Sequence, residues 1–211
     1  MKLYKLFLQE TKKELDYLRD YHNFSERFIK EKVKKLEAWV DEQTPKLTPE
    51  EKDVFFDFYC DDYWELSQNF PNIVRGSLLL ICMALLEHQL TDLCHSLQRT
   101  KKYAFVLNDF SDRGITRTQI YLKKAANIKF PDDTEQWSNI LIYRVIRNAI
   151  AHNDYEIKCS DDLGKVMKFS ENHSSIQFDN AKVILGDTFC LEVIDNIEKF
   201  LDVLYQDKEF Q

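Results

Sequence analysis

Apolar residues recur with a helical period over the first part of the chain. From Ile29 to Val40 they stand at i, i+4, i+7 and i+11, with Lys and Glu between them, which is typical of one face of an amphipathic helix. Residues 1 to about 43 are therefore predicted to form one long helix or two in tandem. Thr44-Pro45 ends it, because proline lacks an amide donor and restricts the residue before it.

A strong start signal follows in Thr48-Pro49-Glu50-Glu51, which combines an N-cap Thr, a proline in the first turn and a capping-box Glu. The helix that it begins carries an apolar face that includes Val54 and Phe58. Asn69-Phe70-Pro71 is predicted to interrupt the helical pattern again. The next helix, Ile73 to about Leu97, has almost no polar face in its first half and should be the central, buried one.

Glu87 interrupts this apolar helix. A buried carboxylate is unfavourable without a partner, so Glu87 lies either on the exposed rim or against an arginine, and we expect the rim. Further along, Arg99 to Gly114 is predicted to be a connecting loop. The helices expected beyond it are Thr116–Asn127, Thr134–His152 and Asp187–Tyr205.

The pattern changes between the last two of these helices. Lys165–Phe169 and Ser175–Phe178 alternate like strands and predict a β-hairpin, with Val183–Leu185 as a third short strand. Only four Gly and four Pro occur in 211 residues, which favours helix. The predicted fold class is all-α: a helical bundle with long N-terminal helices and a small hairpin before the last helix. Residues 1–70 are expected to form a helical extension on a domain spanning 71–211, in one compact unit.

Composition also indicates where the protein acts. The five cysteines include no C-x-x-C pair and are interpreted as reduced thiols, without a zinc site or disulfides. The longest apolar run, Ser77–Leu86, is too short to span a membrane, and charges break up any signal-peptide core at the N-terminus. We expect a cytoplasmic protein with no membrane partner, metal or cofactor.

Net charge is −7, but its distribution is uneven. Between Gln98 and Phe130 eight basic and two acidic residues give 8 − 2 = +6, which leaves −13 for the remainder. A local positive field of this kind can guide a phosphate backbone, and Lys123 and Lys124 are candidate substrate-binding residues within it. The alternative is a solvated, lysine-rich loop and helix.

The clearest candidate for chemistry is Arg147-Asn148-Ala149-Ile150-Ala151-His152. At roughly 100° per residue, Arg144, Arg147, Asn148 and His152 fall within an arc of about 140° on the Thr134–His152 helix, opposite its apolar face. Asn148 and His152 are i, i+4 neighbours, so that the amide can orient the imidazole.

This set of residues suits RNA cleavage without a metal. That reaction needs a base for the ribose 2′-hydroxyl and a cation beside the phosphorane. His152 can be the first and Arg147 the second, while Asn148 orients or contacts the phosphate and Arg144 holds the backbone. The alternative is a solvated stripe or an interhelical hydrogen-bond set. The remaining histidines, His22, His88, His95 and His173, form no close metal pair.

The motif resembles that of HEPN domains (higher eukaryotes and prokaryotes nucleotide-binding), helical bundles whose active members carry Arg, a polar residue, and His after four to six intervening positions. Arg147, Asn148 and His152 match with four. The resemblance covers about Asn72 to Tyr205. A subset of the family carries a modified Tyr two places after the His, whereas here Tyr155 lies three places after it.

The resemblance implies a metal-independent endoribonuclease that leaves a 2′,3′-cyclic phosphate. It also implies a homodimer whose two motif helices face each other across a cleft. Many members are toxins of toxin–antitoxin or phage-defence systems, so RNA and an antitoxin or other protein are the expected partners. The alternative is an inactive helical dimer that binds nucleotide, nucleic acid or protein.

Overall fold

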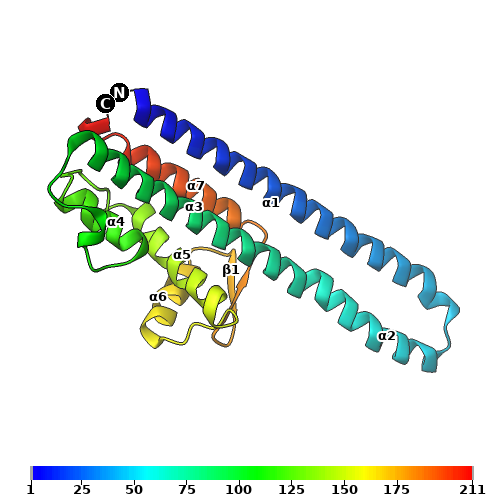
Figure 1. Ribbon diagram of the computed structural model, residues 1–211. Coiled ribbons are helices and arrows are strands. Elements are labelled where there is room, and N and C mark those ends of the chain that lie inside the picture. Colours follow the sequence, from blue (N-terminus) through cyan, green and yellow to red (C-terminus); the bar gives the residue numbers. More distant parts are fainter. Residues whose placement is uncertain (1, 211) are drawn as a thin grey trace.

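A computed structural model describes residues 2–210. Over those residues the chain is mostly helical, with a two-stranded antiparallel hairpin before the last long helix (Figure 1). The all-α prediction is confirmed, and so is the place of the hairpin. The N-terminal region is a single helix, α1 (Lys2–Gln43), and a short 3-10 turn that contains Pro45 follows it.

The capping box at Thr48 starts α2 (Pro49–Trp64) as predicted. The Glu51 amide donates to Thr48 Oγ1, and the Thr48 amide donates to the Glu51 carboxylate at 2.8 Å. These two bonds satisfy amides that a helix N-terminus otherwise leaves unpaired.

The predicted interruption at Asn69-Phe70-Pro71 is wrong. The helix runs on through a π-helical turn, Glu65–Asn69, into α3 (Phe70–Lys101). In that turn the Phe70 amide donates to the Glu65 carbonyl, five residues back. Pro71 comes directly after this turn and has no amide hydrogen to donate. We attribute the continuation of the helix past Pro71 to the wider π-helical turn, which leaves space for the proline ring. The predicted domain boundary at residue 70 falls inside this continuous helix.

By length and composition alone, the helix Pro49–Lys101 could cross a membrane: its most apolar 18-residue window has a mean hydropathy of 1.5. The core helix of a soluble protein meets the same criterion. In the structure 39% of that window is buried, which is consistent with a soluble protein. The continuous helix is much longer than the apolar run Ser77–Leu86 that it contains.

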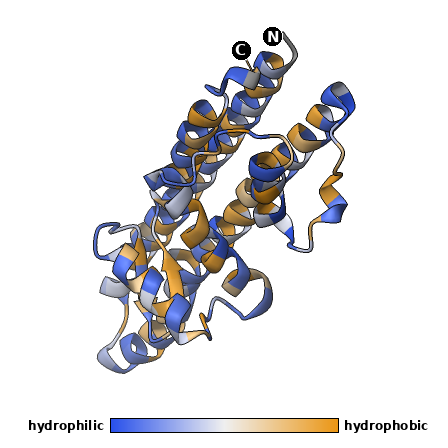
Figure 2. Cartoon of the chain, turned by 90° about the vertical axis from the view of Figure 1, so that its left-hand side faces the viewer, coloured by the Kyte–Doolittle hydropathy of each residue, from blue (hydrophilic) through white to orange (hydrophobic). Residues whose placement is uncertain are grey.

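The core is built around α3, with α4 (Gly114–Lys124), α5 (Glu135–His152) and α7 (Phe189–Leu204) packed near it. Apolar and hydrophilic positions are interleaved along the helices (Figure 2). The first half of α1 lies along α3 and α7 and buries Leu15 completely. Its second half and α2 form a hairpin that extends beyond the bundle (Figure 1), and α2 has no buried residue.

Two of the predicted strands are correct and one is not. The hairpin consists of β1 (Ile176–Asp179) and β2 (Lys182–Leu185). Lys165–Phe169, predicted as a strand, belongs instead to α6 (Ser160–Ser170). Three residues of α6 at a spacing of three, Leu163, Val166 and Phe169, pack against the core, as expected for a helix. The alternation of polar and apolar residues from Lys165 to Phe169 is also compatible with a strand, which is why the prediction was wrong.

Candidate active-site groove

Helix α5 presents the motif because its start, end and buried face are all locally determined. Thr134 caps its N-terminus and accepts from the Trp137 amide. Its C-terminus is His152, after which Asp154 and Tyr155 adopt positive φ and end the helix. The residues that it buries recur every third position: Trp137, Ile140, Tyr143, Ile146 and Ala149.

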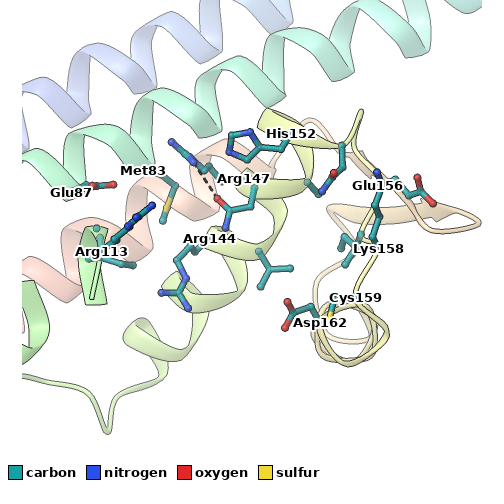
Figure 3. A pocket seen from close by; sticks show the side chains of 17 residues that line it. Met83, Glu87, Arg113, Arg144, Arg147, His152, Glu156, Lys158, Cys159 and Asp162 are labelled. Carbon is teal, nitrogen blue, oxygen red and sulfur yellow. Dashed lines mark hydrogen bonds between the residues drawn. The ribbon is translucent and has the colours of Figure 1, made fainter. Parts of the chain in front are cut away.

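The opposite face of α5 forms one wall of a groove of about 880 Å³ (Figure 3). Helix α3 contributes Met83 and Glu87, and the start of α4 contributes Arg113 to Ile115. The far wall is the segment 153–159 with Asp162 of α6. That segment is tied to the hairpin, because the Val183 amide donates to the Tyr155 carbonyl and the Ile157 amide to the Ala181 carbonyl, each at 3.0 Å.

The structure brings Arg144, Arg147, Asn148 and His152 together as residues that line this groove. His152 is exposed, and Arg147 is partly exposed. The expected hydrogen bond between Asn148 and His152 is absent among residues 2–210. The Asn148 amide oxygen instead accepts from Arg147 Nη1 at 3.1 Å. Within the same residues no group hydrogen-bonds to the His152 ring.

Two further arginines enter the groove beside the motif. Arg144 is half-buried, and its Nη1 donates to Thr116 Oγ1 of α4 at 2.6 Å. Arg113 is exposed and directly precedes α4. Over the part of the chain that the structure describes, Arg113, Arg144 and Arg147 form no ion pair with a carboxylate. Their charges are therefore available to a ligand.

Glu87 of α3 is exposed on the rim of the groove, as expected, and lies next to the start of α4. Gly114 begins that helix with φ +58°, and a Cβ added there would stand 3.4 Å from Glu87 Oε1. Glycine thus permits both the left-handed backbone and the close approach of the two helices. A carboxylate beside the first turn also interacts favourably with the helix dipole of α4.

Lys123 and Lys124 do not line the groove. They occupy the last turn of α4, whereas its first turn faces α5. Lys123 forms an ion pair with Asp132, and hydrogen bonding from the ammonium lowers the pKa of that carboxyl. Among the described residues that line the groove, Arg113 is the one basic residue from the Gln98–Phe130 window. It was not among the residues predicted to bind substrate.

Tyr155 is fixed in the structure. Its hydroxyl donates to the Asn72 carbonyl at 3.1 Å, and burial raises its pKa. A Cβ on Gly76 would collide with this hydroxyl, so the ring packs directly on α3. The other histidines lie outside the groove. No group of three metal-ligating side chains comes together within residues 2–210.

No family model, curated protein or solved structure matches this chain.

Proposed function

We propose that this protein is a metal-independent endoribonuclease of HEPN type that works as a homodimer in the cytoplasm. One observation carries the proposal: Arg147 and His152 open onto one groove, and no carboxylate competes for either side chain among the described residues. A guanidinium beside an accessible imidazole supplies the charge and the base that attack by a 2′-hydroxyl requires.

In the proposed reaction His152 accepts the proton of the ribose 2′-hydroxyl as that oxygen attacks the adjacent phosphorus. Arg147 stabilises the negative charge of the phosphorane, with Asn148 holding the guanidinium through their 3.1 Å hydrogen bond. The bond to the 5′-oxygen breaks, and the leaving oxygen takes a proton from the second His152 of the dimer or from water. The products are a 2′,3′-cyclic phosphate and a 5′-hydroxyl.

The decisive experiment is digestion of total cellular RNA in excess EDTA by the wild-type protein and by His152→Ala. The variant should cut about 10²–10⁴-fold more slowly, and it should keep its fold because the side chain is exposed. His95→Ala is the matched control, since His95 is exposed on α3 and lies outside the groove. No cleavage by wild type, or equal cleavage by His152→Ala, would end the nuclease proposal.

A toxin or phage-defence role, with an antitoxin or another protein as partner, forms part of the same proposal. Expression in bacteria should then arrest growth, and Arg147→Ala should relieve the arrest. Light scattering of the purified protein tests the homodimer directly. A monomer at every concentration would contradict the composite site in which two motif helices face each other.

One observation favours a second candidate, an inactive dimer that binds nucleic acid, nucleotide or a partner protein. The His152 ring has no hydrogen-bond partner among residues 2–210, whereas a catalytic imidazole is commonly oriented by one. Harmless expression together with RNA binding in the absence of cleavage would support this candidate.

A further inference from the structure

The cationic side chains of the groove are not spread evenly. Three of the four Lys and Arg side chains, Arg113, Arg144 and Arg147, lie at the end formed by α4 and α5 (Figure 3). The fourth, Lys158, lies toward the α6 end together with Glu156 and Asp162. Glu87 stands near the arginines but forms no ion pair with them in the described part of the chain. One end of the groove therefore holds three guanidinium groups that form no ion pair within the described residues, more than a single phosphate requires.

Arg144 is held in place before any ligand arrives. Its 2.6 Å hydrogen bond to Thr116 Oγ1 connects α5 to the first turn of α4, where Arg113 also lies. A guanidinium has five N–H donors, and this contact uses one of them. Arg144 can therefore bind an anion with its other donors without losing the bond that orients it.

The arginines define two positions along α5. Arg144 precedes Arg147 by three residues, which is one turn of the same face and about 4.5 Å along the helix axis. The first position comprises Arg147 and His152. The second comprises Arg144 from α5 and Arg113, which reaches in from the start of α4 (Figure 3).

We propose that Arg113 and Arg144 form a second phosphate-binding subsite, which holds the phosphodiester next to the one at Arg147 and His152. This inference rests on the proposed function for the identity of the strand. The RNA strand then runs along α5 and occupies the groove with at least two consecutive phosphates. A dinucleoside monophosphate, with its single phosphate, leaves the second subsite empty.

The first experiment compares cleavage of dinucleoside monophosphates, random in base, with the same compounds carrying one extra phosphate at the 5′ or the 3′ end. For wild type one of the two additions should raise kcat/KM at least about tenfold, because a hydrogen bond to a charged group is stronger than a neutral one. In the double variant Arg113→Gln, Arg144→Gln this gain should disappear. The 5′ and 3′ arms also give the direction of the strand.

The second experiment does not need catalysis. Binding of random-sequence single-stranded oligoribonucleotides to His152→Ala is measured against salt concentration, and each neutralised phosphate contributes about 0.7 to the slope of the log–log plot. Adding Arg113→Gln and Arg144→Gln should lower the slope by about that amount. Adding Arg99→Gln instead, an exposed arginine of α3 outside the groove, should not change it.

The outcomes separate the two proposals. His152-dependent cleavage with no gain from an extra phosphate, and a slope that Arg113→Gln and Arg144→Gln leave unchanged, would overturn the subsite but keep the nuclease. Absence of cleavage by wild type, together with a slope that falls in the double variant, would keep the subsite and end the nuclease. Arg113→Gln alone guards against misfolding, since Arg113 is exposed and makes no hydrogen bond to a described side chain.

Discussion

Arginines in two regions of this molecule have opposite surroundings. Where α1 packs on α3, Arg75 holds both carboxylate oxygens of Glu26 at 2.7 and 2.8 Å and also donates to the Leu185 carbonyl at 2.7 Å. In the groove on the far side of α3, Arg144 and Arg147 meet a hydroxyl and an amide oxygen and no carboxylate. The first arrangement neutralises charge inside the fold, and the second leaves it open to the groove.

The difference separates stability from function. Removing one member of a buried ion pair leaves the other charge buried and uncompensated, which destabilises the fold. A charge without a partner adds little to folding and is free to act on a ligand. Variants at the two places should therefore give opposite results in an unfolding experiment and in a cleavage assay.

The largest effect on stability is expected for Arg75→Ala. The side chains of Arg75 and Glu26 are 14% and 9% exposed, so that the variant leaves a nearly buried carboxylate unpaired. The free energy of unfolding, measured by urea titration, should fall by about 3–5 kcal/mol. Cleavage by the protein that stays folded should be unchanged. A loss below about 1 kcal/mol would show that water reaches this pair and compensates Glu26.

Arg147→Ala should behave in the opposite way. Loss of the cation beside the phosphorane should reduce the rate of RNA cleavage by about 10²–10³-fold. The urea midpoint should stay at the wild-type value, because Arg147 bonds only to the neighbouring Asn148 among described side chains. Arg99→Ala serves as the control in the same cleavage assay. A large drop in the midpoint would contradict the contrast between the two regions.

The region around Arg75 should also respond to pH. His22 on α1 is 4% exposed, and burial lowers its pKa from the ordinary 6.5 of a histidine. Arg75 acts in the same direction, and Glu26 and Asp187 oppose it. The unfolded chain therefore binds this proton more readily than the folded one. The contribution of neutral, buried His22 to the free energy of unfolding is therefore fully present above about pH 6.5. It is lost as the pH falls through the lower pKa of the folded state.

His22→Gln tests this prediction by removing the titrating group. Urea titrations between about pH 7 and about pH 5 should show a shallower loss of stability for the variant than for wild type. Carboxyl groups that do not act on His22, such as Asp132, whose pKa the Lys123 ammonium lowers, titrate in both proteins and cancel in the comparison. Parallel curves for the two proteins would show that His22 is equally protonated in the folded and unfolded states.

The smallest effect is expected where arginine is paired but near solvent. Arg19 bonds to Asp195 at 2.8 Å and to Glu198 at 3.2 Å across the contact between α1 and α7, with the Asp195 side chain 55% exposed. Water screens such pairs, so Arg19→Ala should lower the free energy of unfolding by about 1 kcal/mol or less. A loss as large as that of Arg75→Ala would mean that pairing matters irrespective of burial.

Local signals predicted most of the helix boundaries correctly. Thr48 caps its helix as predicted, α5 begins directly after Thr134, where a helix was expected to start, and Pro45 stands in the turn after α1. The buried face of α5 also follows from its own periodicity, which is why the polar stripe from Arg144 to His152 could be placed in advance. Each of these features depends on residues within one or two helical turns.

Two predictions of secondary structure failed because the local sequence pattern was compatible with more than one backbone conformation. Alternation from Lys165 to Phe169 fits a strand as well as a helix, and contact with the core selected the helix. Pro71 was expected to break a helix, but a π-helical turn directly before it lets the chain continue.

The sequence by itself determined where most of the helices lie and that a guanidinium and an imidazole share one face of α5. Only the tertiary structure decided that Arg113 faces that helix from α4, and that Lys123 and Lys124 do not. The reason is physical. Periodicity orients side chains about the axis of their own helix, whereas the meeting of two helices depends on how their apolar faces pack against α3.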